Sequence, residues 1–95
     1  DKVGAAQAQS MGMIYKVFAA DTFGEQVTAL AEQMAQMPTK GLALTKAALN
    51  ASGTNDMKDQ LDLEETLQTE AGQTYDFNEG VQAFLEKRAP TFKGQ

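Results

Sequence analysis

The carboxy-terminal stretch decides the fold of this chain, and it reads Asp76-Phe77-Asn78-Glu79-Gly80-Val81-Gln82-Ala83-Phe84-Leu85-Glu86-Lys87-Arg88-Ala89-Pro90-Thr91-Phe92-Lys93-Gly94-Gln95. Apolar side chains recur in it at the three- and four-residue spacing of one helix face, at Phe77, Val81, Phe84 and Leu85. Asp76 stands at a capping position, with Glu79 three residues later. Lys87 and Arg88 fall in the expected last turn, where cations favour the helix dipole. The pattern predicts a helix that Asp76 caps and that ends before Pro90.

The same periodicity, read back towards the start of the chain, predicts further helices. They cover residues 5–11, 22–37, 38–52 and 56–72. Gly12 follows the first of them at the position of a left-handed closing residue. Pro38 breaks the second and can open the third, and Gly53 closes the third. We therefore expect short helices joined by tight connections.

One segment, residues 13–18, does not fit a helix. It is a short apolar run rich in β-branched and aromatic residues, which favours an isolated strand or extended segment. A single strand leaves backbone groups that need a partner outside this chain or in a second copy of it. The predicted fold class is mainly α, with four to five short helices and one isolated extended segment.

Composition excludes several classes of function. The chain has 95 residues, a formal net charge of −5, no cysteine and no histidine. An acidic chain is a poor match for nucleic acid, and no apolar run approaches the roughly 20 residues of a membrane span. Without cysteine or histidine, disulfides, thiolate chemistry and the commonest metal ligand are missing. We expect no metal site, no nucleic-acid or membrane partner, and a cytoplasmic location.

Two groups of residues are candidate sites. The carboxylates of Asp59, Asp62 and Glu70 share a predicted helix, but a solvated helix face explains them better than a cation site. Phe84 and Lys87 lie three residues apart, where a ring beside an ammonium group would suit a ligand with an apolar arm and a phosphate. From the pattern alone, a core phenylalanine and a lysine that stabilises the helix end are the favoured alternative.

Residues 76–92 carry the pattern Asp-x-x-Glu-Gly-x-x-Ala-Phe-Leu-x-Lys-Arg-x-Pro-x-Phe. This pattern resembles the carboxy-terminal signature of the enoyl-CoA hydratase/isomerase (crotonase) family. Residues 8–17, 30–38 and 44–50 are similar to further segments of that family, in the same order and spacing. The resemblance therefore extends over nearly the whole chain.

The resemblance implies that residues 1–95 form the carboxy-terminal helical part of a crotonase fold. The family's ββα core, with its oxyanion hole and proton-moving carboxylates, lies upstream of the matched region. We therefore carry over no catalytic residue, and expect a segment of a longer enzyme, which agrees with the missing start methionine. The substrate implied is an acyl-CoA thioester, with no separate cofactor. Residues 60–64 and 71–81 resemble the ring epoxyphenylacetyl-CoA isomerases of bacterial phenylacetate degradation.

In this family the tail helices form the trimerisation region and cover an active site, often that of a neighbouring subunit. The resemblance thus implies a homo-oligomer, a trimer or a dimer of trimers, that binds acyl-CoA. By motif position, Phe84 and Lys87 match the residues that contact coenzyme A, with the lysine reaching a phosphate. Phe92 and Lys93 are a secondary pair. The alternative is an independent helical protein-interaction module without catalytic activity.

Overall fold

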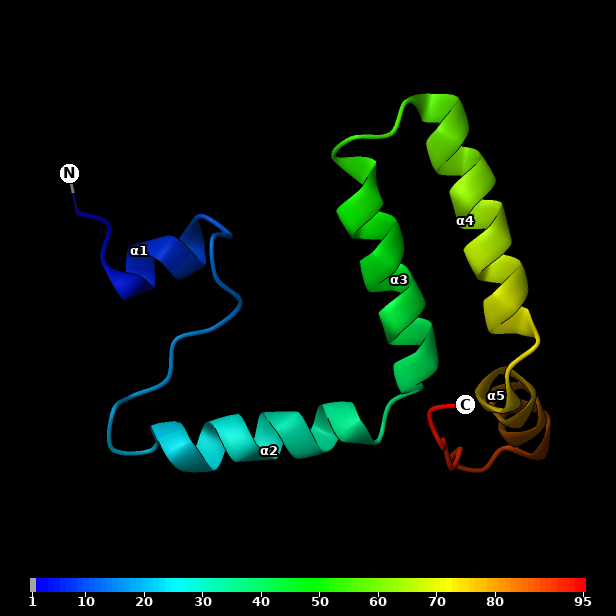
Figure 1. Ribbon diagram of the computed structural model, residues 1–95. Coiled ribbons are helices and arrows are strands. Elements are labelled where there is room, and N and C mark those ends of the chain that lie inside the picture. Colours follow the sequence, from blue (N-terminus) through cyan, green and yellow to red (C-terminus); the bar gives the residue numbers. More distant parts are fainter. Residues whose placement is uncertain (1) are drawn as a thin grey trace. The chain divides into compact units, whose positions relative to one another are not determined.

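The computed structural model describes residues 2–95, which form helices and no strand (Figure 1). The helices are α1 (Ala5–Ser10), α2 (Phe23–Ala35), α3 (Thr39–Ser52), α4 (Met57–Gly72) and α5 (Tyr75–Glu86). The predicted mainly α fold with short helices is confirmed. The chain divides into two compact units, one ending at Ala31 and one running from Glu32 to Gln95, with α2 crossing the boundary.

In the first unit, α1 ends as the sequence predicts. Gly12 takes the left-handed conformation, with φ +75°, and the N–H of Met13 donates to the carbonyl of Ala8 at 2.9 Å. Residues 13–18, expected to be an isolated strand or extended segment, do not form a strand and have no regular secondary structure. A strand requires a neighbouring strand, and none exists within residues 2–95. The Val17 N–H instead donates to the side-chain oxygen of Gln9 at 2.7 Å.

The second unit is built on a helical hairpin of α3 and α4, which lie side by side in Figure 1. Asp56 caps α4 by accepting a hydrogen bond from the Asp59 N–H at 2.8 Å. At the opposite end of the hairpin, Lys40 and Glu70 form an ion pair of 2.6 Å between the two helices. α5 follows α4 after a short break and leads into the carboxy-terminal tail, residues 87–95.

Two predictions for α5 were wrong. Its cap is Thr74 rather than Asp76, since the Thr74 hydroxyl accepts from the Phe77 N–H at 3.1 Å. Asp76 lies inside the first turn, and its carboxylate binds the tail instead. Lys87 and Arg88 do not lie in the last turn, because the helix ends at Glu86 and Lys87 turns left-handed.

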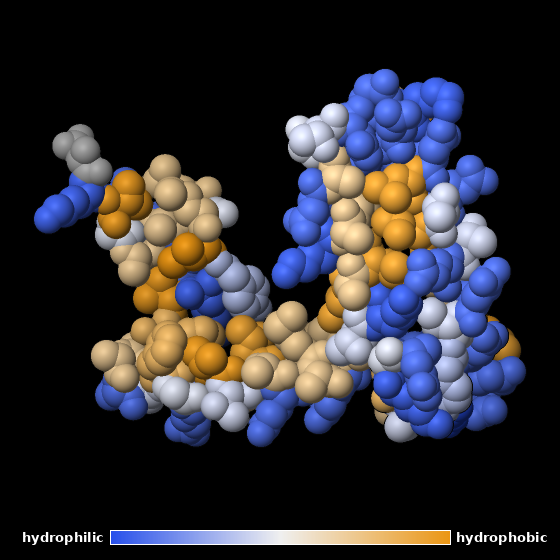
Figure 2. Space-filling model, in the orientation of Figure 1, coloured by the Kyte–Doolittle hydropathy of each residue, from blue (hydrophilic) through white to orange (hydrophobic). Residues whose placement is uncertain are grey.

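The described residues have almost no core. Only Ala83 and Asp76 are buried among residues 2–95, with 1% and 3% exposure. The predicted apolar faces are solvent-exposed, with Phe84 at 83% and Leu85 at 67%. Figure 2 shows apolar atoms gathered along the α3–α4 hairpin. A soluble chain of this size ordinarily buries its large apolar side chains, so these helices have faces that nothing in the described residues covers.

Candidate functional site at the carboxy-terminal helix

The end of α5 is a sharp corner at Lys87. Its φ and ψ of 54° and 40° place it in the left-handed region, the only non-glycine residue of 2–95 with positive φ. The Lys87 N–H donates to the Phe84 carbonyl at 3.3 Å, and the Arg88 N–H donates to the Ala83 carbonyl at 3.0 Å. This is the closing geometry that helices usually give to glycine. A side chain there costs roughly 1–2 kcal/mol, so the corner must be held by its surroundings.

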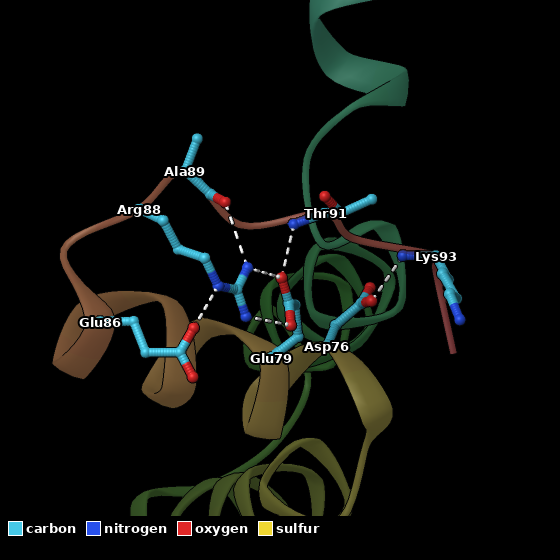
Figure 3. Close-up of polar contacts among 7 residues, drawn as sticks. All are labelled: Asp76, Glu79, Glu86, Arg88, Ala89, Thr91 and Lys93. Carbon is cyan, nitrogen blue, oxygen red and sulfur yellow. Dashed lines mark hydrogen bonds and ion pairs between the residues drawn. The ribbon is translucent and has the colours of Figure 1, made fainter.

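Arg88 supplies much of that hold through a cluster that we call the Arg88 clamp, made of Glu79, Glu86, Arg88 and the Thr91 backbone (Figure 3). The guanidinium pairs with both carboxylate oxygens of Glu79, with Nη1 to Oε1 at 2.6 Å and Nη2 to Oε2 at 3.0 Å. Its Nε donates to Glu86 at 2.6 Å. The Thr91 N–H adds a bond of 2.8 Å to Glu79 Oε1. The clamp therefore ties the residue after the corner back to the middle of α5.

The clamp shifts the acid–base properties of both partners. The hydrogen bonds from Arg88 and then from the Thr91 N–H lower the pKa of Glu79 from 4.5 to about 2. The same hydrogen bond to Glu79, with that to Glu86, raises the pKa of Arg88 further above its ordinary value. Both groups are thus charged throughout the physiological range, and the pair acts as a fixed tie rather than as an acid or base.

A second contact, which we call the Asp76 latch, fixes the end of the tail. The two carboxylate oxygens of Asp76 accept from the N–H groups of Lys93 and Gly94 at 2.6 and 2.8 Å. Gly94 has φ +73°, and a Cβ placed there would lie 2.5 Å from Thr39 Oγ1. Only glycine fits this approach of the tail to the start of α3.

The two predicted pairs, Phe84 with Lys87 and Phe92 with Lys93, have different surroundings. Phe84 is 83% exposed, Lys87 is exposed, and no ion pair of Lys87 is recorded within residues 2–95. Phe92, in contrast, is half-buried with its ring 3.6 Å from the Cβ position of Gly80. Lys93 lies over the ring of Tyr75 at 4.3 Å. Phe84 and Lys87 are thus open to solvent, whereas Phe92 and Lys93 contact Gly80 and Tyr75.

Sequence reasoning missed the groove that runs beside this corner. It has a volume of about 460 Å³ and lies between α3, α5 and the tail. Its mainly apolar wall includes Pro38, Phe77, Val81, Phe84 and Phe92. The spacing of the α5 stripe indicated one wall, but the other walls come from residues far away in the chain, such as Pro38.

Among residues 2–95, no cluster of three or more His, Cys, Asp or Glu side chains is arranged to hold a metal ion. No helix in this part of the chain combines the length and the apolar character needed to cross a membrane.

The chain is similar to known proteins of one family. The family model for enoyl-CoA hydratase/isomerase matches residues 1–95. The 1,2-epoxyphenylacetyl-CoA isomerase of Escherichia coli K12 is 43% identical over 95 residues, covering all of this chain and 36% of that protein. A protein of Rhodobacter capsulatus, named as a probable enoyl-CoA hydratase, is also 43% identical over 95 residues, covering all of this chain and 37% of its own length. The solved enoyl-CoA hydratase structure from Geobacillus kaustophilus superimposes with a TM-score of 0.89 at 26% identity, covering all of this chain and 36% of that one.

This chain belongs to the enoyl-CoA hydratase/isomerase family, and the predicted resemblance is confirmed. It spans a little over a third of the length of these relatives, 36% of the E. coli isomerase. Its structural neighbours are crotonase-fold proteins, of which it matches a little over a third.

Proposed function

We propose that residues 1–95 are the carboxy-terminal helical domain of a crotonase-type enzyme, inactive by itself, that contributes subunit contacts and coenzyme A contacts. The observation that carries this proposal is the lack of a core. Only two of the described residues are buried, while Phe84, Leu85 and Leu49 are 83%, 67% and 68% exposed. Helices with such faces are stable when another part of the protein or another subunit covers them.

The proposed binding residues are Phe84 and Lys87. The apolar ring suits the pantetheine arm or the adenine of coenzyme A, and the ammonium group suits a phosphate. Lys87 keeps a left-handed conformation that glycine would adopt with less strain. A side chain retained at such a position is more readily explained by a ligand than by the fold.

For the reaction, we propose isomerisation of 1,2-epoxyphenylacetyl-CoA, as in phenylacetate catabolism. Support comes from the 43% identity to the E. coli isomerase. Assay of the full-length protein against this epoxide and against a 2-enoyl-CoA decides between isomerase and hydratase. Turnover of the enoyl thioester alone would replace the isomerase assignment by hydration.

The binding role is tested with Lys87→Ala in the full-length enzyme. Loss of a charged hydrogen bond weakens binding by about 1–3 kcal/mol, so KM for the CoA thioester should rise at least several-fold. The truncated N-acetylcysteamine thioester lacks the phosphates, and its KM should not change. Lys58→Ala removes another lysine, from an exposed ion pair on α4, and serves as the control. An unchanged KM for the CoA thioester would remove Lys87 from the site.

The subunit-contact role is tested with the isolated chain. Its uncovered apolar faces should drive self-association, measured by analytical ultracentrifugation over a range of concentrations. A monodisperse monomer at high concentration would contradict this role and favour the independent interaction module.

A further inference from the structure

We propose that Glu79 is a positioning residue for coenzyme A binding, which acts by holding Arg88 and thereby fixing the left-handed corner that carries Lys87. This inference rests on the proposed function, since it assumes that Lys87 binds a phosphate. Glu79 itself does not touch the ligand, because both of its oxygens are occupied within the chain.

Several hydrogen bonds meet on the carboxylate of Glu79. Glu79 accepts two bonds from Arg88 and one from the Thr91 N–H, and its side chain is only 11% exposed. Two parallel bonds fix the plane of a guanidinium as well as its distance. The residue immediately after Lys87 is therefore held in both position and orientation.

The backbone of Lys87 at the corner is strained. A lysine prefers a right-handed conformation by roughly 1–2 kcal/mol, which would continue the helix by one residue and turn its side chain to a different direction. The Arg88 N–H bond to Ala83 and the Glu79–Arg88 pair both require the left-handed turn. When the pair is lost, the right-handed alternative is opposed only by the backbone bonds at the corner and by the contacts of the tail with Asp76 and Gly80.

A purely structural role for the clamp makes a different prediction. If Glu79 only stabilised the fold, its loss would affect every substrate and would do so whether or not Lys87 were present. If Glu79 acts through Lys87, its loss should affect only ligands that carry phosphates, and only when the lysine is there. A double-mutant cycle separates the two cases.

The experiment uses the full-length protein with Glu79→Gln, Lys87→Ala and the double variant. KM and kcat are measured with a CoA thioester and with its N-acetylcysteamine analogue. Glu79→Gln should raise KM for the CoA thioester by about fivefold, equivalent to about 1 kcal/mol, without changing kcat. In the Lys87→Ala background the same substitution should change KM less than about twofold. KM for the truncated thioester should stay constant throughout.

Arg88→Lys provides a second variant that keeps the charge but cannot form two parallel bonds with Glu79. It should reproduce the effect of Glu79→Gln. Glu70→Gln, which breaks the ion pair with Lys40 between α3 and α4, is the matched control and should leave KM unchanged.

The outcomes distinguish this inference from the proposed function. No effect of Lys87→Ala would overturn both. An effect of Lys87→Ala, combined with a Glu79→Gln effect that is absent or equal in both backgrounds, would overturn the positioning role alone. An equal effect on the truncated thioester would also overturn it.

Discussion

The Asp76 latch makes the sharpest prediction about this structure. Each oxygen of the carboxylate accepts one backbone N–H, from Lys93 at 2.6 Å and from Gly94 at 2.8 Å, and the residue is 3% exposed. Asp76→Asn preserves the shape but replaces one acceptor by an NH₂ group that faces a donor. One hydrogen bond to a charged group is lost, which weakens docking of the tail by about 2–3 kcal/mol.

Hydrogen exchange of the tail measures this loss directly. A docking energy lower by about 2–3 kcal/mol raises the opening equilibrium by about 30- to 150-fold, so the amides of Lys93 and Gly94 should exchange faster by that factor. Asp59→Asn removes the same charge from an exposed position on α4 and should leave the tail unchanged. Tail exchange within twofold of the unsubstituted protein would refute the latch.

Three further predictions concern α5. The carboxyl carbon of Glu79 should titrate by NMR with a midpoint near pH 2. Because folding lowers this pKa from 4.5, the ionised Glu79 contributes its full stabilisation of the fold above pH 4.5. That stabilisation is lost as the pH falls towards 2. A midpoint at the ordinary value would show that the pair with Arg88 does not form in solution. Thr74→Ala should destabilise the first turn by about 1 kcal/mol, seen as faster amide exchange there, since it removes the cap. Gly80→Ala should slow amide exchange in α5, corresponding to a stabilisation of about 0.5–1 kcal/mol. The added Cβ would lie at an ordinary contact distance of 3.6 Å from Phe92. Faster exchange would mean that Phe92 leaves less room for the Cβ than this distance indicates.

The sequence was sufficient to predict the two helices of the hairpin. Predicted helices at 38–52 and 56–72 correspond to α3 at Thr39–Ser52 and α4 at Met57–Gly72. Both are bounded by residues whose effect is local, a proline that breaks one helix and an aspartate that caps the next. At such positions, local interactions determine where a helix begins or ends.

The errors at α5 have a long-range cause. Thr74 and Asp76 are both good caps, and the sequence does not show that Asp76 is needed by amides 17 and 18 residues later. Likewise, Lys87 and Arg88 fit a last turn until Glu79, nine residues earlier, is seen to hold the arginine. Contacts made when the tail folds back thus override local preference.

The periodicity predicts the apolar stripe of α5, but the favoured interpretation of Phe84 as a core residue is wrong within the described residues. Periodicity shows which side of a helix is apolar, and it does not show what covers that side. Phe84 is 83% exposed, so no part of the described residues covers it.

The residues of the carboxy-terminal signature separate into two groups once their contacts are known. Those with partners inside the chain are Asp76, Glu79, Gly80, Ala83, Arg88 and Phe92. Phe84 is 83% exposed and Lys87 is exposed, at a corner that the first group builds. A side chain stabilises a fold only through atoms that it contacts. Lys87 has a strained backbone and forms none of the ion pairs found within residues 2–95, so replacing it with glycine should preserve or increase stability while weakening coenzyme A binding. That separation of stability from binding is what distinguishes a ligand contact from a structural residue.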